Sequence, residues 1–281
     1  MRENPMQICF HQTIMPAWTG CKRFVRVALC LAIVSGSLAG GVSVSLAENA
    51  LPSHSPSSGW PHDGVIGTYD RAALRRGLQV YREVCAACHS LKYVAYRNLA
   101  DLGYSEAEIK SIAAESQVTD GPNDQGEMYT RPALPSDKLV APFANDQAAR
   151  VANNGALPPD LSLIIKARQG HEDYVYSLLT GYGLTPSAEE HIMEGMNFNP
   201  YFAGHQIAMP SPLSEGAVTY TDGAPATVER MAQDVTQFLA WSGDPKMEER
   251  KRVGVKAILF LLVFAGVMAA VKLRVWRGAH K

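Results

Sequence analysis

Two cysteines separated by two residues, and followed at once by a histidine, constrain this chain more than any other feature of its sequence. Cys85, Cys88 and His89 belong to the run Cys-Ala-Ala-Cys-His. In such a run both sulfurs can bond covalently to one edge of a haem, while the histidine coordinates the iron. The run therefore predicts a chain that folds around a large, flat, covalently attached group.

Two other chemistries use closely spaced cysteines. A zinc site needs a second pair of ligands, but the other three cysteines all lie in an amino-terminal segment that we expect to be removed: Cys9, Cys21 and Cys30. A thioredoxin-like dithiol lies in an alternating pattern of strands and helices, which is missing around Cys85. The sequence therefore predicts one haem c per chain, attached through Cys85 and Cys88.

Helical patterns dominate residues 48–246. Five residues follow one another at steps of three or four along one helical face: Leu74, Leu78, Tyr81, Cys85 and Cys88. Asp70 or Thr68 can cap this helix, and Ser105 with Glu108 has the spacing of a capping box. A further amphipathic helix covers 228–238 and stops at 243–245. Because strand patterns are scarce and residues 52–66, 118–142 and 197–225 have the composition of loops, the predicted fold class is mainly α with long loops.

A second axial ligand would close the iron to substrates and favour electron transfer. The candidates are the methionines and histidines after the motif: Met128, Met193, Met196, Met209, Met231, Met247, His171, His191 and His205. Met193, Met196 and Met231 have helical spacing, where methionine usually fills a core. Met209 lies in a loop stiffened by Pro210 and Pro212. The local sequence favours Met209, and His205 remains open as an alternative.

Residues 1–47 have the organisation of a signal peptide. Lys22, Arg23 and Arg26 precede an apolar run, and a stretch of small residues ends at Ala47. We expect cleavage after Ala47 and export of the residues that follow. The alternative is an amino-terminal membrane helix, which the Gly and Ser content of 35–45 disfavours.

The carboxy-terminal end predicts a membrane anchor. Residues 257–271 are uninterrupted apolar sequence, with Lys256 and Lys272 at either side. With its flanks from Val253 to Trp276 the helix is about 36 Å long, enough to cross a hydrocarbon layer about 30 Å thick if the two lysines extend to the interfaces. A buried core helix is the alternative.

The central part of the chain is acidic. From Glu48 to Met247 there are 24 acidic and 14 basic residues, a net charge of −10. The basic residues gather instead at the two ends, as expected for a signal peptide and for membrane-flanking segments. Nothing resembles the basic stripe that a nucleic-acid partner needs.

A series of short strings, in order, resembles the cytochrome c1 family over nearly everything from Gly67 to the anchor. These strings are Cys85-Ala-Ala-Cys-His89, Arg131-Pro, Pro135-Ser-Asp137, Ala148-Ala-Arg150, Ala152-Asn-Asn-Gly-Ala-Leu-Pro-Pro-Asp-Leu-Ser162, Ala167-Arg168, Asp173-Tyr174, Leu178-Leu-Thr-Gly-Tyr182, Asn199-Pro-Tyr-Phe202 and Ile207-Ala-Met-Pro210. The resemblance implies an enlarged cytochrome c-like haem domain with long loops, plus one C-terminal transmembrane helix.

Carried over residue by residue, the resemblance implies the contacts of the cofactor. His89 and Met209 become the axial ligands of the iron, and Arg168 lies near a haem propionate. Tyr174 and the turn at Pro158 and Pro159 line the pocket. From the residues alone, Arg168 could equally be a solvated cation at a helix end and Tyr174 a core aromatic.

The resemblance also implies the protein's place in a larger assembly. The chain would carry single electrons from a Rieske iron-sulfur protein to a soluble cytochrome c, beside cytochrome b in a quinol-oxidising, dimeric complex. Residues 1–47 would be the signal peptide, 48–246 the periplasmic haem domain, and 247–281 the anchor in the membrane lipid with a short cytoplasmic tail. The location would be a bacterial inner membrane. The alternatives are another anchored monohaem cytochrome, such as an oxidase subunit, and a sensor or enzyme with an open haem site.

Overall fold

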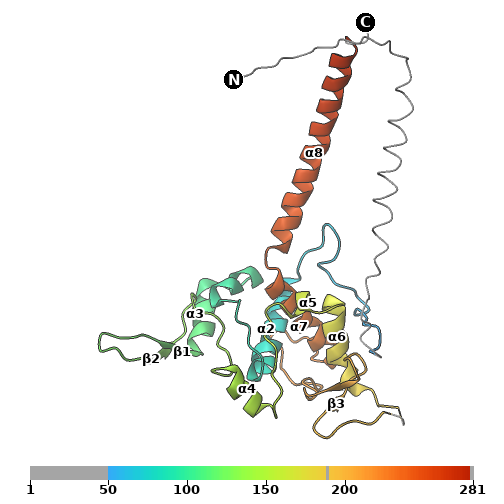
Figure 1. The fold of residues 1–281 in the computed structure, drawn as a ribbon. Helices are drawn as coiled ribbons and strands as arrows, with labels where there is room; N and C mark the ends of the chain where they lie inside the picture. The colour runs from blue at the N-terminus through green and yellow to red at the C-terminus, as the bar shows by residue number, and fades with distance from the viewer. Residues whose placement is uncertain (1–49, 188–189, 279–281) are drawn as a thin grey trace, which may run out of the picture. The chain divides into compact units, whose positions relative to one another are not determined.

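The computed structural model describes residues 50–187 and 190–278 (Figure 1). The predicted signal peptide lies outside the described residues. The residues from Ala47 to Lys281 form one unit. Within the described part, the α-helices are α2 (Arg71–Glu83), α3 (Glu106–Ala114), α4 (Asp146–Ala152), α5 (Ile164–Ala167), α6 (His171–Thr180), α7 (Val228–Gly243) and α8 (Met247–Trp276). The 3-10 turns are η1 (Cys85–Ala87), η2 (Tyr96–Leu102) and η3 (Gly181–Gly183). The mainly α prediction is confirmed.

The core forms where α2 packs against α7. Leu74, Leu78 and Tyr81 on α2 are at most 1% exposed, and the Tyr81 ring lies 5.8 Å from that of Phe238 on α7. A Cβ atom on Gly77 would lie 2.1 Å from the backbone oxygen of Asp234, so only glycine lets the two helices approach this closely. The amphipathic helix predicted over 228–238 is therefore confirmed as α7 and forms half of the core.

A buried ion pair fixes α2 against α7. The guanidinium of Arg76 donates to both carboxylate oxygens of Asp234 at 2.8 and 3.0 Å, and to Asp222 at 2.9 Å. Burial raises the pKa of Asp234, and the hydrogen bonds and charge of Arg76 oppose that rise. Because a buried carboxylate needs a partner, this pair favours one arrangement of the two helices.

The predicted helix caps are present, but the first helix is shorter than expected. Asp70 accepts from the backbone amides of Ala72 and Ala73 at 2.9 and 3.4 Å, so Asp70 is the cap. Ser105 and Glu108 form the predicted capping box of α3. The expectation that one helix runs through the cysteines is wrong, because α2 ends at Glu83 and a 3-10 turn follows.

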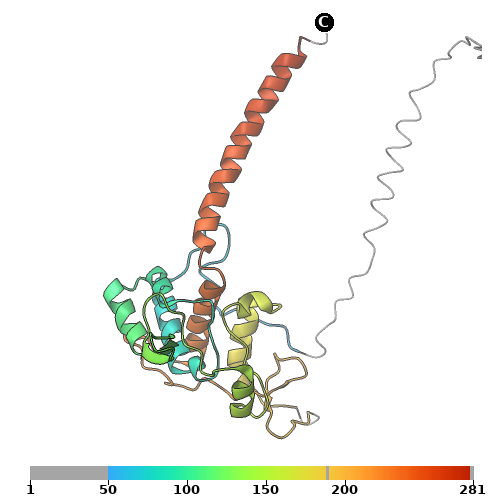
Figure 2. The same ribbon diagram turned by 60° about the vertical axis from the view of Figure 1, so that its left-hand side comes forward.

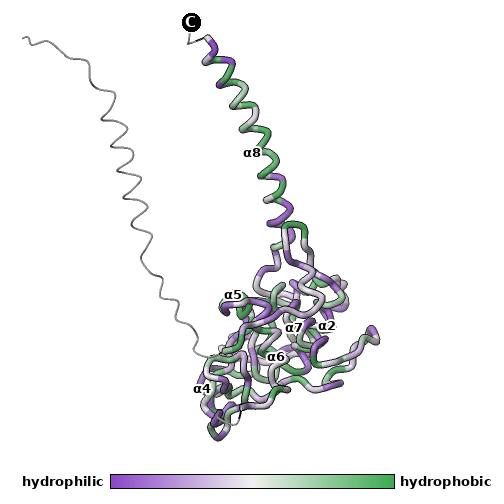
Figure 3. Tube along the Cα trace, turned by 90° about the vertical axis from the view of Figure 1, so that its right-hand side faces the viewer, coloured by the Kyte–Doolittle hydropathy of each residue, from purple (hydrophilic) through white to green (hydrophobic). Residues whose placement is uncertain are grey.

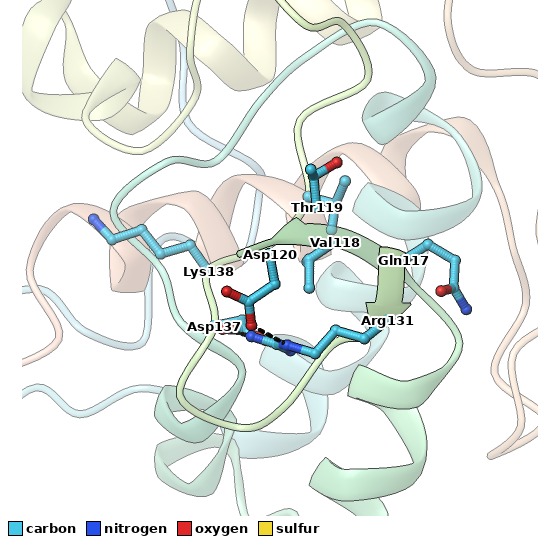
Figure 4. A pocket seen from close by; sticks show the side chains of 8 residues that line it. Gln117, Val118, Thr119, Asp120, Arg131, Asp137 and Lys138 are labelled. Atoms are coloured by element: carbon cyan, nitrogen blue, oxygen red, sulfur yellow. Dashed lines mark hydrogen bonds and ion pairs between the residues drawn. The ribbon is translucent and has the colours of Figure 1, made fainter. Parts of the chain in front are cut away.

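Two stretches predicted as loops contain short antiparallel strands. In the first, β1 (Gln117–Asp120) pairs with β2 (Tyr129–Pro132). Arg131 on β2 bonds to Asp120 at 2.5 Å and to Asp137 at 2.6 Å, beside an open hollow of about 450 Å³ (Figure 4). In the second, β3 (Asn197–Phe198) pairs with β4 (Gln206–Ile207).

Helix α8 is the one candidate membrane span among the described residues. It has 30 residues, about 45 Å at 1.5 Å per residue. Its residues from Ile258 to Val271 are exposed, and the hydropathy colouring of the central part of α8 in Figure 3 shows that this stretch is mainly apolar. At its first turn Met247 is buried, and Glu248 accepts from the backbone amide of Tyr69 at 2.7 Å. The helix is thus joined to the rest of the fold at its base.

Candidate functional site

The two cysteines lie in a tight 3-10 turn directly after α2. The backbone amides of Cys88 and His89 donate to the oxygen of Cys85 at 3.1 and 2.9 Å. Since a 3-10 helix has three residues per turn, residues i and i+3 lie on the same side. Cys85 is half-buried and Cys88 is exposed. A 3-10 turn, rather than the continuous helix that we expected, therefore brings the two cysteines to one side.

The acidity of Cys85 differs from that of a redox dithiol. Burial raises the pKa of the Cys85 thiol to about 12, and the neighbouring Cys88 adds to the rise. Dithiols that exchange disulfides, and thiols that bind zinc, need a lowered thiol pKa. Among the residues that the structure describes, no three His, Cys, Asp or Glu side chains are grouped to hold a metal ion.

The imidazole of His89 is oriented by the backbone. Its Nδ1 atom lies 2.8 Å from the oxygen of Pro159. A carbonyl oxygen can only accept, so Nδ1 carries the proton and Nε2 carries the free lone pair. Burial lowers the pKa of His89, which favours the neutral ring that can act as a ligand. The hydroxyl of Tyr81 donates to the His89 oxygen at 3.1 Å and ties the motif to α2.

The carboxylate of Asp160 holds the Pro159 carbonyl in place. It accepts from the hydroxyl of Ser90 at 2.8 Å and from the backbone amides of Lys92 and Ser162 at 2.9 Å each. Burial raises the pKa of Asp160, but these hydrogen bonds outweigh burial and hold it below its usual value. Because Ser90 and Lys92 are the first and third residues after His89, Asp160 joins the Pro158–Pro159 turn to the segment after the motif.

Met209 lies two residues beyond β4 in a loop held by a tyrosine. The hydroxyl of Tyr182 donates to the Met209 oxygen at 3.0 Å. The Met209 side chain is half-buried. Burial raises the pKa of Tyr182 and keeps its hydroxyl protonated as a donor. Tyr182 belongs to the functional region but was not among the predicted site residues; its only sequence signal was its place in a family string.

The rival ligand His205 is already engaged. Its Nδ1 contacts the carboxylate of Glu190, and its ring meets that of Phe198 edge-on at 6.0 Å. The backbone of His205 has φ 58°, which fixes the turn between β3 and β4. These contacts fix the β3–β4 turn through Nδ1, much as Pro159 fixes His89, so they do not decide between His205 and Met209 as the partner of His89.

Other methionines are placed poorly for a ligand. Met231 is fully buried between α2 and α7, and Met247 is buried at the base of α8. Met128 lies in the β1–β2 hairpin and is 61% exposed, and Met193 is 57% exposed. Met196 is half-buried like Met209 and directly precedes β3 rather than lying in a helix, so Met209 is distinguished from it by the hydrogen bond from Tyr182.

The remaining predicted residues are Arg168, Tyr174 and Pro158. Arg168 directly follows α5 and is exposed, while Tyr174 is half-buried in α6. Burial raises the pKa of Tyr174, and the charge of Arg168 opposes the rise. Pro158 precedes the Pro159 turn. Within the described residues no hydrogen bond joins Arg168 or Tyr174 to His89.

The donor set fits a haem c. Two sulfurs on one side of a turn can bond to one porphyrin edge, an oriented imidazole can provide nitrogen, and a braced loop can provide a thioether. Residues from three regions supply these groups: 85–89, 158–160 and 209. The hollow beside Arg131 and a second one, lined by Leu78, Tyr96 and Leu139, include neither His89 nor Met209.

Comparisons with known proteins all show similarity to one family. A sequence model of the Cytochrome C1 family matches residues 60–279. A mitochondrial cytochrome c1 haem protein of Arabidopsis thaliana is 51% identical over 244 residues, covering 87% of this chain and 79% of its own. Cytochrome c1 of Rhodospirillum rubrum is 47% identical, covering 78% and 86%. The "cytochrome b-c1 complex catalytic subunit, mitochondrial" of Candida albicans is 49% identical, covering 78% and 75%.

Proposed function

The chain belongs to the cytochrome c1 family, and from this membership we propose that it accepts single electrons from a Rieske iron-sulfur protein and passes them to a soluble cytochrome c. Membership gives the chain an electron-transfer role as a subunit of a cytochrome bc1 oxidoreductase complex. In the proposal the chain makes and breaks no bonds of the quinol itself. Cytochrome b is its neighbour in a dimeric complex.

The proposal assigns the cofactor contacts to named residues. Cys85 and Cys88 attach one haem c through thioethers, and His89 and Met209 are the axial ligands. Bound there, the haem supplies a one-electron couple at iron, with a potential raised by the methionine sulfur. Arg168 pairs with a propionate, while Tyr174, Pro158 and Pro159 line the pocket.

The protein's own residues keep this site rigid. The Pro159 carbonyl holds the His89 ring in one tautomer, and Asp160 holds that carbonyl. Tyr182 holds the Met209 backbone. Because both sides of the ligand pair are fixed by hydrogen bonds, a change of iron charge requires little rearrangement, which suits rapid electron transfer.

The proposed location follows from the two ends of the chain. The leader, residues 1–47, exports the head, and α8 then retains it at the membrane. The head therefore lies on the periplasmic side of a bacterial inner membrane, with a short cytoplasmic tail after α8. The span of α8 supports the membrane part of this proposal.

The observation that carries the proposal is the orientation of His89 by Pro159 directly after a 3-10 turn that begins at Cys85 and is closed by Cys88. The test is mass spectrometry of a tryptic peptide covering residues 85–89 from matured protein. We expect the mass of one haem bound through two thioethers. Recovery of free thiols or of a disulfide would refute haem attachment.

Two rival functions predict different results in two further measurements. An open-site sensor or enzyme would bind carbon monoxide when reduced, whereas a His89 and Met209 pair would not. An oxidase subunit would co-purify in mild detergent with a terminal oxidase, whereas we expect cytochrome b and a Rieske protein. Loss of quinol-dependent cytochrome c reduction in a strain lacking the chain completes the test.

A further inference from the structure

A small loop before α2 has an apolar tip on a rigid neck. In the 61–68 loop, Val65 is 69% exposed and Ile66 is 90% exposed. The backbone amide of Thr68 donates to the oxygen of Pro61 at 3.2 Å and closes the loop. Two aliphatic side chains are thus held outward at the end of a closed loop.

The neck of the loop is built for close packing. A Cβ atom on Gly67 would lie 1.9 Å from the backbone oxygen of Asp63, so only glycine allows the two sides of the neck to approach. The side chain of His62 is 94% buried and its Nε2 lies 3.3 Å from the Glu172 carboxylate on α6. These contacts fix the direction in which the tip of the loop points.

The base of α8 holds the same loop. The ammonium of Lys251 donates to the oxygens of His62 and Gly67, at 2.5 and 3.2 Å. The segment before α2 accordingly lies beside the first turns of α8 in both ribbon views (Figures 1 and 2). One lysine of the membrane helix therefore fixes both ends of the apolar tip.

The distances place the tip near the membrane surface. Lys251 precedes the uninterrupted apolar run at 257 by six residues, about 9 Å along the helix. Val65 is the third residue after His62, and three extended residues reach at most about 10 Å. The headgroup layer on each side of the hydrocarbon is roughly 5–8 Å thick. A tip rising beside α8 thus reaches the depth of that layer.

We propose that the 61–68 loop is a second membrane contact, in which Val65 and Ile66 enter the headgroup layer of the bilayer that α8 crosses. The inference rests on the anchoring role of α8 in the proposed function. Exposed apolar side chains on a loop held by α8, which itself carries the exposed Arg252 and Lys256, suit the boundary between headgroups and acyl chains. Protein partners, by contrast, are usually held by aromatic or arginine anchors in pockets. A head attached at two points cannot rotate freely about α8.

The test uses the full chain with its haem, reconstituted in phosphatidylcholine vesicles. Single cysteines replace Ile66, Val151 or Phe260, and each carries a nitroxide label whose position is confirmed by mass spectrometry. Val151 on α4 is 85% exposed and serves as the control in water, and Phe260 on α8 is the control in the bilayer. The measurement is the collision rate with dissolved oxygen relative to a water-soluble nickel chelate.

We expect the oxygen-to-nickel ratio at Ile66→Cys to be several-fold higher than at Val151→Cys and below that at Phe260→Cys. A ratio equal to that of Val151→Cys, with a membrane-like ratio at Phe260→Cys, would overturn the loop contact and leave the anchor intact. Water-like ratios at both positions would refute the anchor itself. Protection from both reagents in the intact complex would show a protein partner and overturn the lipid contact.

Discussion

The Nδ1 atom of His89 lies 2.8 Å from the backbone oxygen of Pro159, a residue 70 positions further along the chain. This contact sets the tautomer of the ring that we propose as an iron ligand. It depends in turn on a carboxylate, because the residue after Pro159 is tied to Ser90, Lys92 and Ser162. A substitution of Asp160 can therefore change the orientation of His89 while leaving His89 itself in place.

Asp160→Ala should loosen His89 while leaving haem attachment intact. Hydrogen bonds to a charged group contribute about 1.5–3 kcal/mol each. Because the hydrogen bonds of Asp160 are partly exposed, we expect the free energy of unfolding to fall by about 2 kcal/mol in total. A weaker Nδ1 hydrogen bond makes the imidazole a poorer donor, so the midpoint potential should rise. Chemical unfolding and a redox titration measure both effects. Asp124→Ala, in the exposed turn of the β1–β2 hairpin, is the control. It should have the same stability and midpoint potential as the parent protein.

The same carboxyl predicts a pH dependence. Hydrogen bonds hold the pKa of Asp160 below its usual 3.8, so the unfolded chain binds its proton at a higher pH than the folded chain. The stabilisation by Asp160 is thus present above about pH 4 and is lost as pH falls through the lower folded pKa. Between pH 5 and 3, parent stability should fall more steeply than that of Asp160→Ala. Parallel curves would contradict the clamp.

The helical core could be predicted from the sequence because its signals are local. Asp70 caps α2, the box of Ser105 and Glu108 caps α3, and the spacing from Val228 to Phe238 predicted α7. The β1–β2 hairpin was missed, because its four-residue strands are held by Arg131, Asp120 and Asp137 rather than by apolar alternation. Ion pairs between residues that are separated in the sequence produce no periodic pattern from which a strand could be predicted.

The candidate site was predictable only in part for a similar reason. Cys85, Cys88 and His89 form a contiguous motif, and Met209 stands out beside prolines. The roles of Asp160 and Tyr182 were missed, because their contacts reach back to Ser90 and forward to Met209 across long stretches of chain. The end of α2 before Cys85 was missed too, since 3-10 and α turns share the i to i+3 spacing.

The ion pair between α2 and α7 makes a prediction about stability. Asp234→Ala should destabilise the fold by about 3 kcal/mol, because Arg76 loses its buried partner and keeps only the more exposed Asp222. The double change Arg76→Met with Asp234→Leu should recover most of the loss, since it removes both charges together. Thermal unfolding of the three proteins in detergent measures this. As a control, removing the exposed partner of Lys110 by Glu106→Ala should leave the melting temperature unchanged.

Two truncations of α8 should behave differently. Ending the chain after Arg252 keeps buried Met247 and keeps Glu248 on Arg71 and the Tyr69 amide. Ending it after Lys246 removes both contacts, worth about 2 kcal/mol together. Both proteins should be soluble and red, with the shorter melting roughly 5 °C lower. Membrane attachment of either as firm as that of the full chain would mean that the leader is retained or the anchor misplaced, since the 61–68 loop offers only two aliphatic side chains.

The acidic head makes a kinetic prediction. With a net charge of −10 from Glu48 to Met247, it should attract a basic soluble cytochrome c over long range. The bimolecular rate of cytochrome c reduction should therefore fall steeply as salt rises, since exposed charges are screened beyond about 10 Å at 0.1 M. Stopped-flow measurements over a salt series test this. A flat rate would exclude steering by this surface.

Replacing Met209 tests the ligand on which the electron-transfer proposal depends. A thioether stabilises ferrous over ferric iron, so its loss should lower the midpoint potential below the range of the Rieske donor. Met209→Leu should keep the covalent haem, lose the weak far-red sulfur-to-iron absorption, bind carbon monoxide and abolish turnover of the assembled complex. His205→Ala is the matched comparison. It frees the Glu190 carboxylate and the Phe198 ring, so the loop loosens, but the sulfur remains and turnover should persist. Should Met209→Leu retain the parent spectrum while His205→Ala loses it, the iron has two histidine ligands, and the bracing of Met209 by Tyr182 serves the loop alone.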